Sequence, residues 1–274
     1  MIGGGALFFD LKPQNGTIND INPRLINFYK TVRDYPEKLI KISESFKSPK
    51  SAPDPSRDFS EVNRKGKKIK NYYYQQRELF NCRPNGEDFD PLHEAALLLY
   101  LNRTCYNGLY RENSSGEFNV PIGRYKNPDW VREKKVFKAS ETLRKVEIYN
   151  KDFNYIIRNA KPGDLVYFDP PYVPMSSTAN FTDYNADGFN KKHQKKLLRL
   201  AKKLDKADIK IIISNSGVMY DFYERHGFFV DFIHATRAIN SNPDKRGEIA
   251  EIIATNIAPK YRRGKKQRDL KEFL

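Results

Sequence analysis

The chain has 274 residues, of which 39% are hydrophobic and 13% aromatic, enough for a sizeable core in one large domain or two smaller ones. Its 49 Lys and Arg residues exceed its 34 Asp and Glu residues, and the formal net charge of +15 favours a polyanionic partner such as nucleic acid. No apolar stretch approaches the roughly 18 residues that cross a membrane, and two cysteines, Cys82 and Cys105, are too few for a disulfide framework or a four-ligand zinc site. We therefore expect a cytoplasmic protein with reduced thiols, no metal and no membrane partner.

The chain begins with "MIGGGALFFDL". A glycine loop of this kind normally follows a strand and turns the chain into a helix, but here Met1 stands where the strand would end. Gly3, Gly4 and Gly5 are therefore either a leftover linker or the second half of a nucleotide-binding loop. The segment "ALFFDL" predicts the first turns of a helix, and "GTIND" predicts a short strand that ends at Asp20.

Two helices and a hairpin are predicted in the next part of the chain. The segment "PRLINFYKTVRDYPEKLIKI" predicts one amphipathic helix with Pro23 at its start, where a missing N–H costs little. Residues 44–70 are rich in Ser, Pro and Lys and predict an exposed insertion. The segment "DPLHEAALLLYLNRTCYN" predicts a second helix, and "GLYRENSSGEFNVPIGRY" predicts a hairpin around a Ser-Ser-Gly turn.

From about residue 143 strand and helix patterns alternate, which predicts an α/β fold with a mostly parallel sheet covered by helices. The expected strands are "LRKVEIYN", "DLVYFDPPY", "IKIIISN", "FFVDFIH" and "EIAEIIATNI", with a helix over "NKKHQKKLLRLAKKLDKA". We expect a sheet domain of residues 1–43 and 132–259, interrupted by a helical-plus-hairpin insertion at 44–131 and followed by a basic tail at 260–274. No internal repeat is apparent.

The tetrapeptide Asp169-Pro170-Pro171-Tyr172 follows the apolar strand "LVYF" directly. As a purely structural feature it would be a stiff turn that leaves a sheet, with Tyr172 in a packing role. As a functional feature, the prolines fix the backbone so that the Asp169 carboxylate and the Pro170 carbonyl act as paired acceptors. Two acceptors on the hydrogens of an exocyclic amino group localise its lone pair for attack, and the Tyr172 ring offers a face on which a planar base stacks. Open α/β sheets bind ligands at this edge.

Together, "FDPPY" and "IGGGALFFDL" resemble the S-adenosylmethionine (SAM) dependent amino-methyltransferases. The resemblance implies a Rossmann-like sheet that binds SAM, with Asp169 also at the cofactor. Gly3, Gly4 and Gly5 would pass the amino-acid end of SAM, and Asp20 would accept both ribose hydroxyls. Phe153, with Asp152 beside it, would stack on the cofactor adenine; the alternative for Phe153 is a place in the core.

The segments "YNGLYRENSSGEFNVPIGRY", "STANFTDYNADGF" and "NSNPDKRGEIAEII" bring the chain closer to the Dam-type DNA adenine-N6 methyltransferases, and the matches span nearly its whole length. The resemblance implies that the hairpin lies in the major groove of double-stranded DNA and that Arg111 bonds guanine O6 and N7. Leu109 would be a wedge that enters the base stack, with Tyr106 and Asn107 beside the gap left by the flipped base. Pro121 would contact the thymine methyl group, and Arg124 and Tyr125 would contact the phosphate backbone. Taken singly, Arg111 could be a solvated residue, and Leu109 or Tyr125 could pack the hairpin.

The implied reaction is methylation of adenine N6, within GATC, by a monomer that extrudes the base from the stack and closes the loop 176–185, with Phe181, over it. The alternatives are methylation of RNA or of a protein glutamine, and DNA binding without catalysis. The basic runs 64–70 and 260–266 are either plain solvated surface or phosphate contacts. Since Met1 stands where the family has the Phe of an F-x-G-x-G pattern, we also expect poor SAM binding and poor folding of the chain as written, and rescue by an upstream extension.

Overall fold

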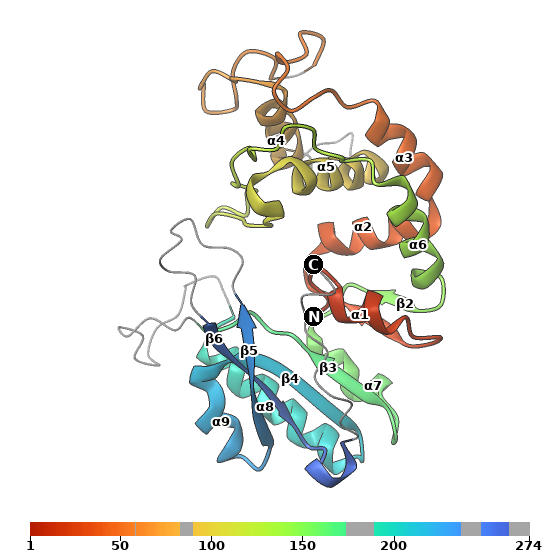
Figure 1. The fold of residues 1–274 in the computed structure, drawn as a ribbon, viewed down its shortest axis with the longest axis vertical. Helices are drawn as coiled ribbons and strands as arrows, with labels where there is room; N and C mark the ends of the chain where they lie inside the picture. The colour runs from red at the N-terminus through yellow and green to blue at the C-terminus, as the bar shows by residue number, and fades with distance from the viewer. Residues whose placement is uncertain (58, 83–89, 174–188, 237–247, 263–274) are drawn as a thin grey trace. The chain divides into compact units, whose positions relative to one another are not determined.

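The computed structural model describes residues 1–57, 59–82, 90–173, 189–236 and 248–262 (Figure 1). It divides into two compact units, Ile2–Asp152 and Phe153–Leu274, with Met1 assigned to the second. The mixed α/β class predicted from the sequence is confirmed. The inserted recognition domain and its boundaries stay a prediction.

The first unit is mainly helical. Its elements in chain order are α1 (Ala6–Leu11), β1 (Thr17–Asn19), α2 (Pro23–Asp34), α3 (Pro36–Glu44), α4 (Tyr72–Cys82), α5 (Pro91–Thr104), the 3-10 turn η2 (Tyr106–Gly108), α6 (Glu133–Leu143) and β2 (Glu147–Tyr149). Helix α5 packs against α2, α3 and α4, while α6 packs against α2 and α3. The strands β1 and β2 form a parallel pair, with Ile18 opposite Ile148. Three predictions are therefore confirmed: the helical turns at "ALFFDL", the strand at "GTIND" and the helix at "DPLHEAALLLYLNRTCYN".

The single helix predicted from Pro23 onward is wrong, because the chain breaks between α2 and α3. Tyr35 has φ −137° and ψ 45° and is the C-cap of α2. Pro36 has no N–H to continue the α2 ladder, and its ring disfavours the helical conformation in the residue before it. Tyr35 therefore ends one helix, and Pro36 begins the next at a position where proline is well tolerated.

A buried ion pair joins three helices of the first unit. Arg24 on α2 lies 3.1 Å from the Glu94 carboxylate on α5, and both side chains are buried. The Arg24 guanidinium lies 3.8 Å from the centre of the Phe80 ring on α4 and donates to the Phe80 carbonyl. Asn27 donates to the second Glu94 oxygen at 3.1 Å. Because buried charges are stable only when they are paired and hydrogen-bonded, these contacts fix how α2, α4 and α5 pack.

The hairpin after α5 is formed by a small number of backbone contacts. Antiparallel bridges join Glu112 to Phe118 and Cys105 to Ile122. The Ser-Ser-Gly turn lies between Glu112 and Phe118, as the sequence predicts. Phe118 is buried in the core of the unit. The hairpin is therefore anchored along one side of its second arm.

The second unit is a sheet with helices. Its elements are η3 (Phe153–Tyr155), α7 (Ile156–Asn159), β3 (Leu165–Phe168), α8 (Lys191–Lys206), β4 (Lys210–Ser216), η4 (Gly217–Met219), α9 (Tyr220–Glu224), β5 (Phe229–Thr236), β6 (Glu248–Thr255) and η6 (Pro259–Tyr261). The strand order is β3-β4-β6-β5. Helix α8 buries Leu197, Leu200, Ala201 and Leu204, one stripe at helical spacing, in a core with Ile211 and Ile213 of β4.

The prediction of a mostly parallel sheet is only partly right for this unit. Strands β3 and β4 are parallel, whereas β6 is antiparallel to both β4 and β5. The chain between β5 and β6 is too short for the crossover helix that a parallel pair needs, so the two strands pair antiparallel. Strand β6 then lies between β4 and β5.

Candidate active site and DNA-reading hairpin

Asp169 of the predicted acceptor turn is held by a serine on the neighbouring strand. The parallel register puts Phe168 opposite Ile213, so the next residues, Asp169 and Ser214, also lie side by side at the carboxyl ends of β3 and β4. Ser214 Oγ donates to Asp169 Oδ1 at 2.8 Å, and Tyr167 OH donates to Ser214 Oγ at 3.1 Å. We call these three residues the strand-end network. It fixes one carboxylate oxygen of Asp169 and leaves the other, Oδ2, without a hydrogen bond within the described part of the chain.

Tyr172 lies beside a second carboxylate. Its hydroxyl donates to Glu251 Oε2 on β6 at 3.5 Å, a long hydrogen bond. Burial raises the pKa of Tyr172 to about 12, and the negative charges of Glu251 and Asp169 act in the same direction. The hydroxyl therefore stays protonated at neutral pH and can hold the ring in one orientation. Pro170 is buried, whereas Asp169 is exposed to solvent.

The N-terminal glycines form a turn rather than an extended linker. Gly3 and Gly5 adopt left-handed conformations with φ 49° and φ 69°. A Cβ on Gly5 would approach the Phe9 ring to 3.0 Å and the Tyr29 hydroxyl to 3.1 Å, whereas open space surrounds Gly3 and Gly4. Tyr29 OH donates to the Gly3 carbonyl at 2.7 Å. The loop is thus built into the first unit, with its first glycines accessible.

Asp20, at the end of β1, holds this loop. The Ile2 and Gly3 N–H groups both donate to Asp20 Oδ2 at 3.2 Å, and the Asn22 N–H donates to Oδ1 at 3.0 Å. The side chain of Asn22 caps α2. A carboxylate has about four acceptor sites, and three are used by the backbone here. Asp20, only 8% exposed, therefore has one site left for a ligand hydroxyl unless the loop N–H groups move.

Asp152 and Phe153 belong to different units and differ in exposure. Asp152, the last residue of the first unit, is exposed. Phe153, the first of the second unit, is 8% exposed and packs in the core with its ring 5.9 Å from Phe189. The Lys196 ammonium lies 5.0 Å from the centre of the Phe153 ring. These contacts make Phe153 a core residue; its stacking on a cofactor adenine stays a prediction.

At the base of the hairpin, Asn107 and Gly108 both take left-handed conformations, with φ 53° and φ 62°. The Asn102 side chain donates to the Gly108 carbonyl at 2.7 Å, and Tyr106 N–H donates to the Pro121 carbonyl at 2.8 Å. Asn107 and Pro121 are exposed, and Tyr106 is half-buried. Tyr106 and Asn107, the predicted neighbours of Leu109, therefore lie on one hydrogen-bonded turn.

The remaining predicted DNA contacts lie on the same hairpin or just after it. Arg111 is exposed, and its Nε donates to Asn119 Oδ1 at 2.7 Å, which orients the guanidinium from the opposite arm. Leu109 packs partly buried against the core of the unit. Arg124 is exposed, and Tyr125 is 41% exposed. The structure thus brings the predicted hairpin residues together, while their contacts to DNA stay predictions.

No helix was predicted over α4, yet this helix docks the hairpin. Asn81 of α4 accepts from Phe118 N–H at 2.8 Å and donates to the Phe118 carbonyl at 3.0 Å, as a paired strand would. Tyr73 OH donates to the Val120 carbonyl at 2.8 Å, and Arg77 donates to the same carbonyl at 3.3 Å. The spacing of Tyr73, Arg77 and Asn81 by four residues puts them on one helix face, which is the signal that the sequence contained.

Some predicted segments lie outside the described residues. They are the loop 176–185 with Phe181, most of the segment "NSNPDKRGEIAEII", and all but the first three residues of the tail 260–274. Their predicted roles stay predictions. Within the described ranges, no helix is long and apolar enough to span a bilayer, and no group of three or more His, Cys, Asp or Glu residues could hold a metal ion.

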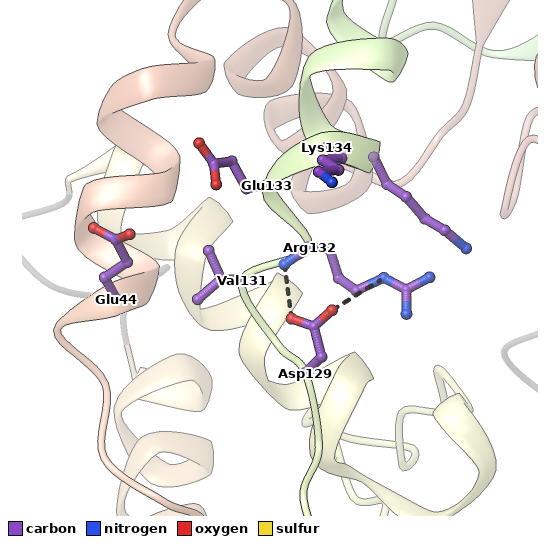
Figure 2. Close-up of a pocket in the computed structure, with 7 residues that line it drawn as sticks. Glu44, Asp129, Val131, Arg132, Glu133 and Lys134 are labelled. Atoms are coloured by element: carbon purple, nitrogen blue, oxygen red, sulfur yellow. Dashed lines mark hydrogen bonds and ion pairs between the residues drawn. The ribbon is translucent and has the colours of Figure 1, made fainter.

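An open pocket lies between the end of α3 and the start of α6 (Figure 2). It is lined by Glu44, Asp129, Val131, Arg132, Glu133, Lys134 and Lys135. Figure 2 shows Asp129 turned toward Arg132, whose backbone N–H donates to it at 3.1 Å. Because Asp129 and Arg132 pair with each other here and none of the predicted site residues lines it, this pocket is not a candidate for the methyl-transfer site.

Residues 2–241 match the family described as D12 class N6 adenine-specific DNA methyltransferase. The Type II methyltransferase M1.LlaDCHI of Lactococcus lactis subsp. cremoris is 38% identical over 260 residues, 93% of this chain and 84% of that protein. The Type II methyltransferase M.MjaIII of Methanocaldococcus jannaschii is 37% identical over 262 residues, 93% of this chain and 86% of that protein. The DNA adenine methylase of Escherichia coli (strain K12) is 33% identical over 255 residues, 92% of this chain and 83% of that protein. The resemblance noted in the sequence is thereby confirmed, and the chain belongs to the D12 class N6 adenine-specific DNA methyltransferases, a family of enzymes.

Proposed function

We propose that this enzyme transfers a methyl group from SAM to N6 of adenine in duplex DNA, within GATC, after the base is extruded from the stack. The observation that carries the proposal is the strand-end network. Ser214 fixes one oxygen of Asp169 at a sheet edge where α/β proteins bind ligands, and the free oxygen is available to an amino group.

The chemistry assigned to Asp169 is that of an acceptor. The adenine amino nitrogen is a poor nucleophile because its lone pair is delocalised into the ring. Asp169 Oδ2 and the Pro170 carbonyl would accept its two N–H groups, which localises the lone pair toward the methyl donor. Tyr172 would support the ring of the extruded base, and Glu251 would hold the Tyr172 hydroxyl.

The described residues fit a SAM molecule in part. Gly3 and Gly4 have open space beside them, and Asp20 keeps one acceptor site beside the glycine loop. When bound, SAM supplies an electrophilic methyl group. The chain's own contribution is to orient the cofactor with the loop and the acceptor amine with Asp169.

The assignment of GATC comes from the resemblance to the Dam-type enzymes, and the hairpin supports its guanine contact. Arg111 projects from it with its guanidinium oriented by Asn119, as bidentate guanine recognition requires. The name of the E. coli DNA adenine methylase supports adenine in DNA as the target base.

Transfer of labelled methyl groups from SAM to short duplexes tests the proposal. Duplexes containing GATC should be methylated at adenine N6, and duplexes with one base pair of the site changed should not. An RNA or protein glutamine substrate that is methylated faster than the GATC duplex would refute the assignment, as would an Asp169→Ala variant with near wild-type activity. Asp169→Asn, which keeps one acceptor oxygen, should retain more activity than Asp169→Ala.

A further inference from the structure

The insertion contains a second hairpin turn that repeats the geometry of the predicted DNA-reading turn fifty positions earlier. In the reading hairpin, Asn113 N–H donates to the Glu117 carbonyl at 2.9 Å, and Gly116 N–H donates to the Asn113 carbonyl at 2.9 Å. In the earlier turn, Asn63 N–H donates to the Lys67 carbonyl at 2.8 Å, and Gly66 N–H donates to the Asn63 carbonyl at 2.9 Å. The two turns have the same backbone hydrogen bonds.

The agreement extends to the side chains and arms. Asn63 Oδ1 accepts from the N–H groups two and four residues later, both at 2.9 Å, as Asn113 Oδ1 does at 3.0 and 2.9 Å. The antiparallel bridges join Val62 to Lys68 and Glu112 to Phe118, at equivalent positions. Residues 61–69 and 111–119 are therefore two copies of one short hairpin. We call residues 61–70, which include the lysine that follows the first copy, the basic hairpin, and residues 111–119 the reading hairpin.

Ion pairs tie the two hairpins together at their tips. Glu117 of the reading hairpin lies 2.9 Å from Arg64 Nη2 and 3.2 Å from Lys65 Nζ of the basic hairpin. Arg64 also pairs with Glu78 on α4. Hydrogen bonds from Asn113 and Lys65 lower the pKa of Glu117, so its carboxylate is charged at neutral pH. Arg64 and Lys65 thus use their charges within the protein, and the basic hairpin is held beside the reading hairpin.

Three lysines of the basic hairpin keep their charge for an external partner. Lys67, Lys68 and Lys70 are exposed and form no ion pair within the part of the chain that the structure describes. Ile69 between them is 5% exposed and packs inward, so Lys68 and Lys70 point to solvent by the alternation of side chains along a strand. The result is three exposed cations on a fixed support, of which Lys68 and Lys70 lie on one side of the arm.

We propose that the basic hairpin is a second DNA-contacting element, in which Lys67, Lys68 and Lys70 bind backbone phosphates of the duplex next to the site read by Arg111. The proposal rests on the proposed function, since it assumes that the reading hairpin lies on DNA. Cations held beside a groove-reading element meet the polyanion that this element engages. Such contacts position the protein and carry no base information.

The test compares two triple variants of the full chain. One combines Lys67→Ala, Lys68→Ala and Lys70→Ala. The matched control combines Lys195→Ala, Lys202→Ala and Lys206→Ala, which removes the same charge from exposed positions of α8 in the other unit. Affinity for a GATC duplex of about 24 base pairs and for the same duplex with the site scrambled is measured over a series of salt concentrations. A urea midpoint checks that each variant folds.

Each neutralised phosphate contributes about 0.9 to the magnitude of the slope of log Kobs against log salt. We expect the basic-hairpin variant to lose about 2 to 3 from the magnitude of that slope and to bind both duplexes about tenfold or more weakly at low salt, with an unchanged ratio between them. The α8 control should change the slope by less than about 1. If the two variants had equal slopes while the wild-type protein bound the GATC duplex, this inference would be overturned and the proposed function would stand. A wild-type protein that binds neither duplex would overturn the proposed function as well.

Discussion

Replacing Ser214 with alanine should slow methyl transfer without weakening DNA binding. Ser214 is 4% exposed and donates to Asp169 Oδ1 at 2.8 Å, while its own oxygen accepts from Tyr167. The variant removes the donor that orients the carboxylate. Because Asp169 is exposed, water can replace the lost bond, but the carboxylate is then free to rotate.

The size of the effect follows from the kind of bond that is lost. A hydrogen bond to a charged group contributes about 1.5 to 3 kcal/mol, and the exposed side of Asp169 favours the lower end. Since each 1.36 kcal/mol is a factor of ten in rate, a loss of about 1.5 kcal/mol lowers kcat by roughly tenfold. KM for the duplex should change little, because Ser214 is not among the residues that are predicted to read the DNA. The free energy of unfolding should fall by about 1 kcal/mol.

A matched control lies two residues further along the same strand. Ser216 is as buried as Ser214, but its hydroxyl has no hydrogen-bond partner among the described residues. Steady-state and single-turnover methylation of a GATC duplex would be compared for Ser214→Ala and Ser216→Ala, together with urea unfolding of both. If Ser214→Ala retained wild-type kcat, or if Ser216→Ala lost as much, the positioning role of the strand-end network would be refuted.

Three further outcomes follow from contacts elsewhere. Gly123→Ala would place its Cβ 2.6 Å from the Tyr125 ring and 2.7 Å from the Cys105 carbonyl, so we expect urea unfolding to show a loss of about 1 to 3 kcal/mol; an unchanged midpoint would contradict the close packing. Burial raises the pKa of Cys105 to about 11, so a thiol reagent at pH 8 should modify Cys82 in the native protein and both cysteines only after unfolding. The pKa of Tyr172 is raised to about 12, so the stability that the protonated hydroxyl contributes should be lost as the pH rises from about 10 to 12. The tyrosinate absorbance at 295 nm that the wild type shows and Tyr172→Phe lacks should appear only above about pH 11.

The sequence located Asp169 correctly at the end of a strand but did not reveal Ser214. An apolar run followed by Asp-Pro-Pro predicts a strand end from local properties alone. The contact with Ser214 depends on the register of β3 against β4, which pairs Phe168 with Ile213. Register is set by packing over the whole sheet, so a single sequence does not contain it in readable form. Glu251 is a similar case, because its place beside Tyr172 depends on β6 entering the sheet antiparallel.

At Asp20 the sequence predicted a ligand contact but did not reveal the surroundings of the side chain. An acidic residue at the end of a strand suggested a ligand for two ribose hydroxyls. Three backbone N–H groups already bond to that carboxylate, and two of them belong to the glycine loop itself. Asp20 is therefore first a residue that shapes the loop. Substituting it would disturb loop and ligand together, so loss of SAM binding in such a variant would not by itself identify a direct contact.

The paired hairpins show why a charge run is hard to interpret without a structure. The sequence of residues 61–69 shares with 111–119 only an asparagine and a glycine three positions apart, too little to suggest a repeat. Both residues are required by the turn, since Asn63 and Asn113 accept from two N–H groups and Gly66 and Gly116 have φ 70° and φ 72°. The ion pairs that join the tips link positions about fifty residues apart, which no local pattern predicts. With those pairs known, the basic run separates into two braced cations and three available ones. That division changes an undirected preference for polyanions into the proposal of a phosphate contact at a definite place beside the reading hairpin.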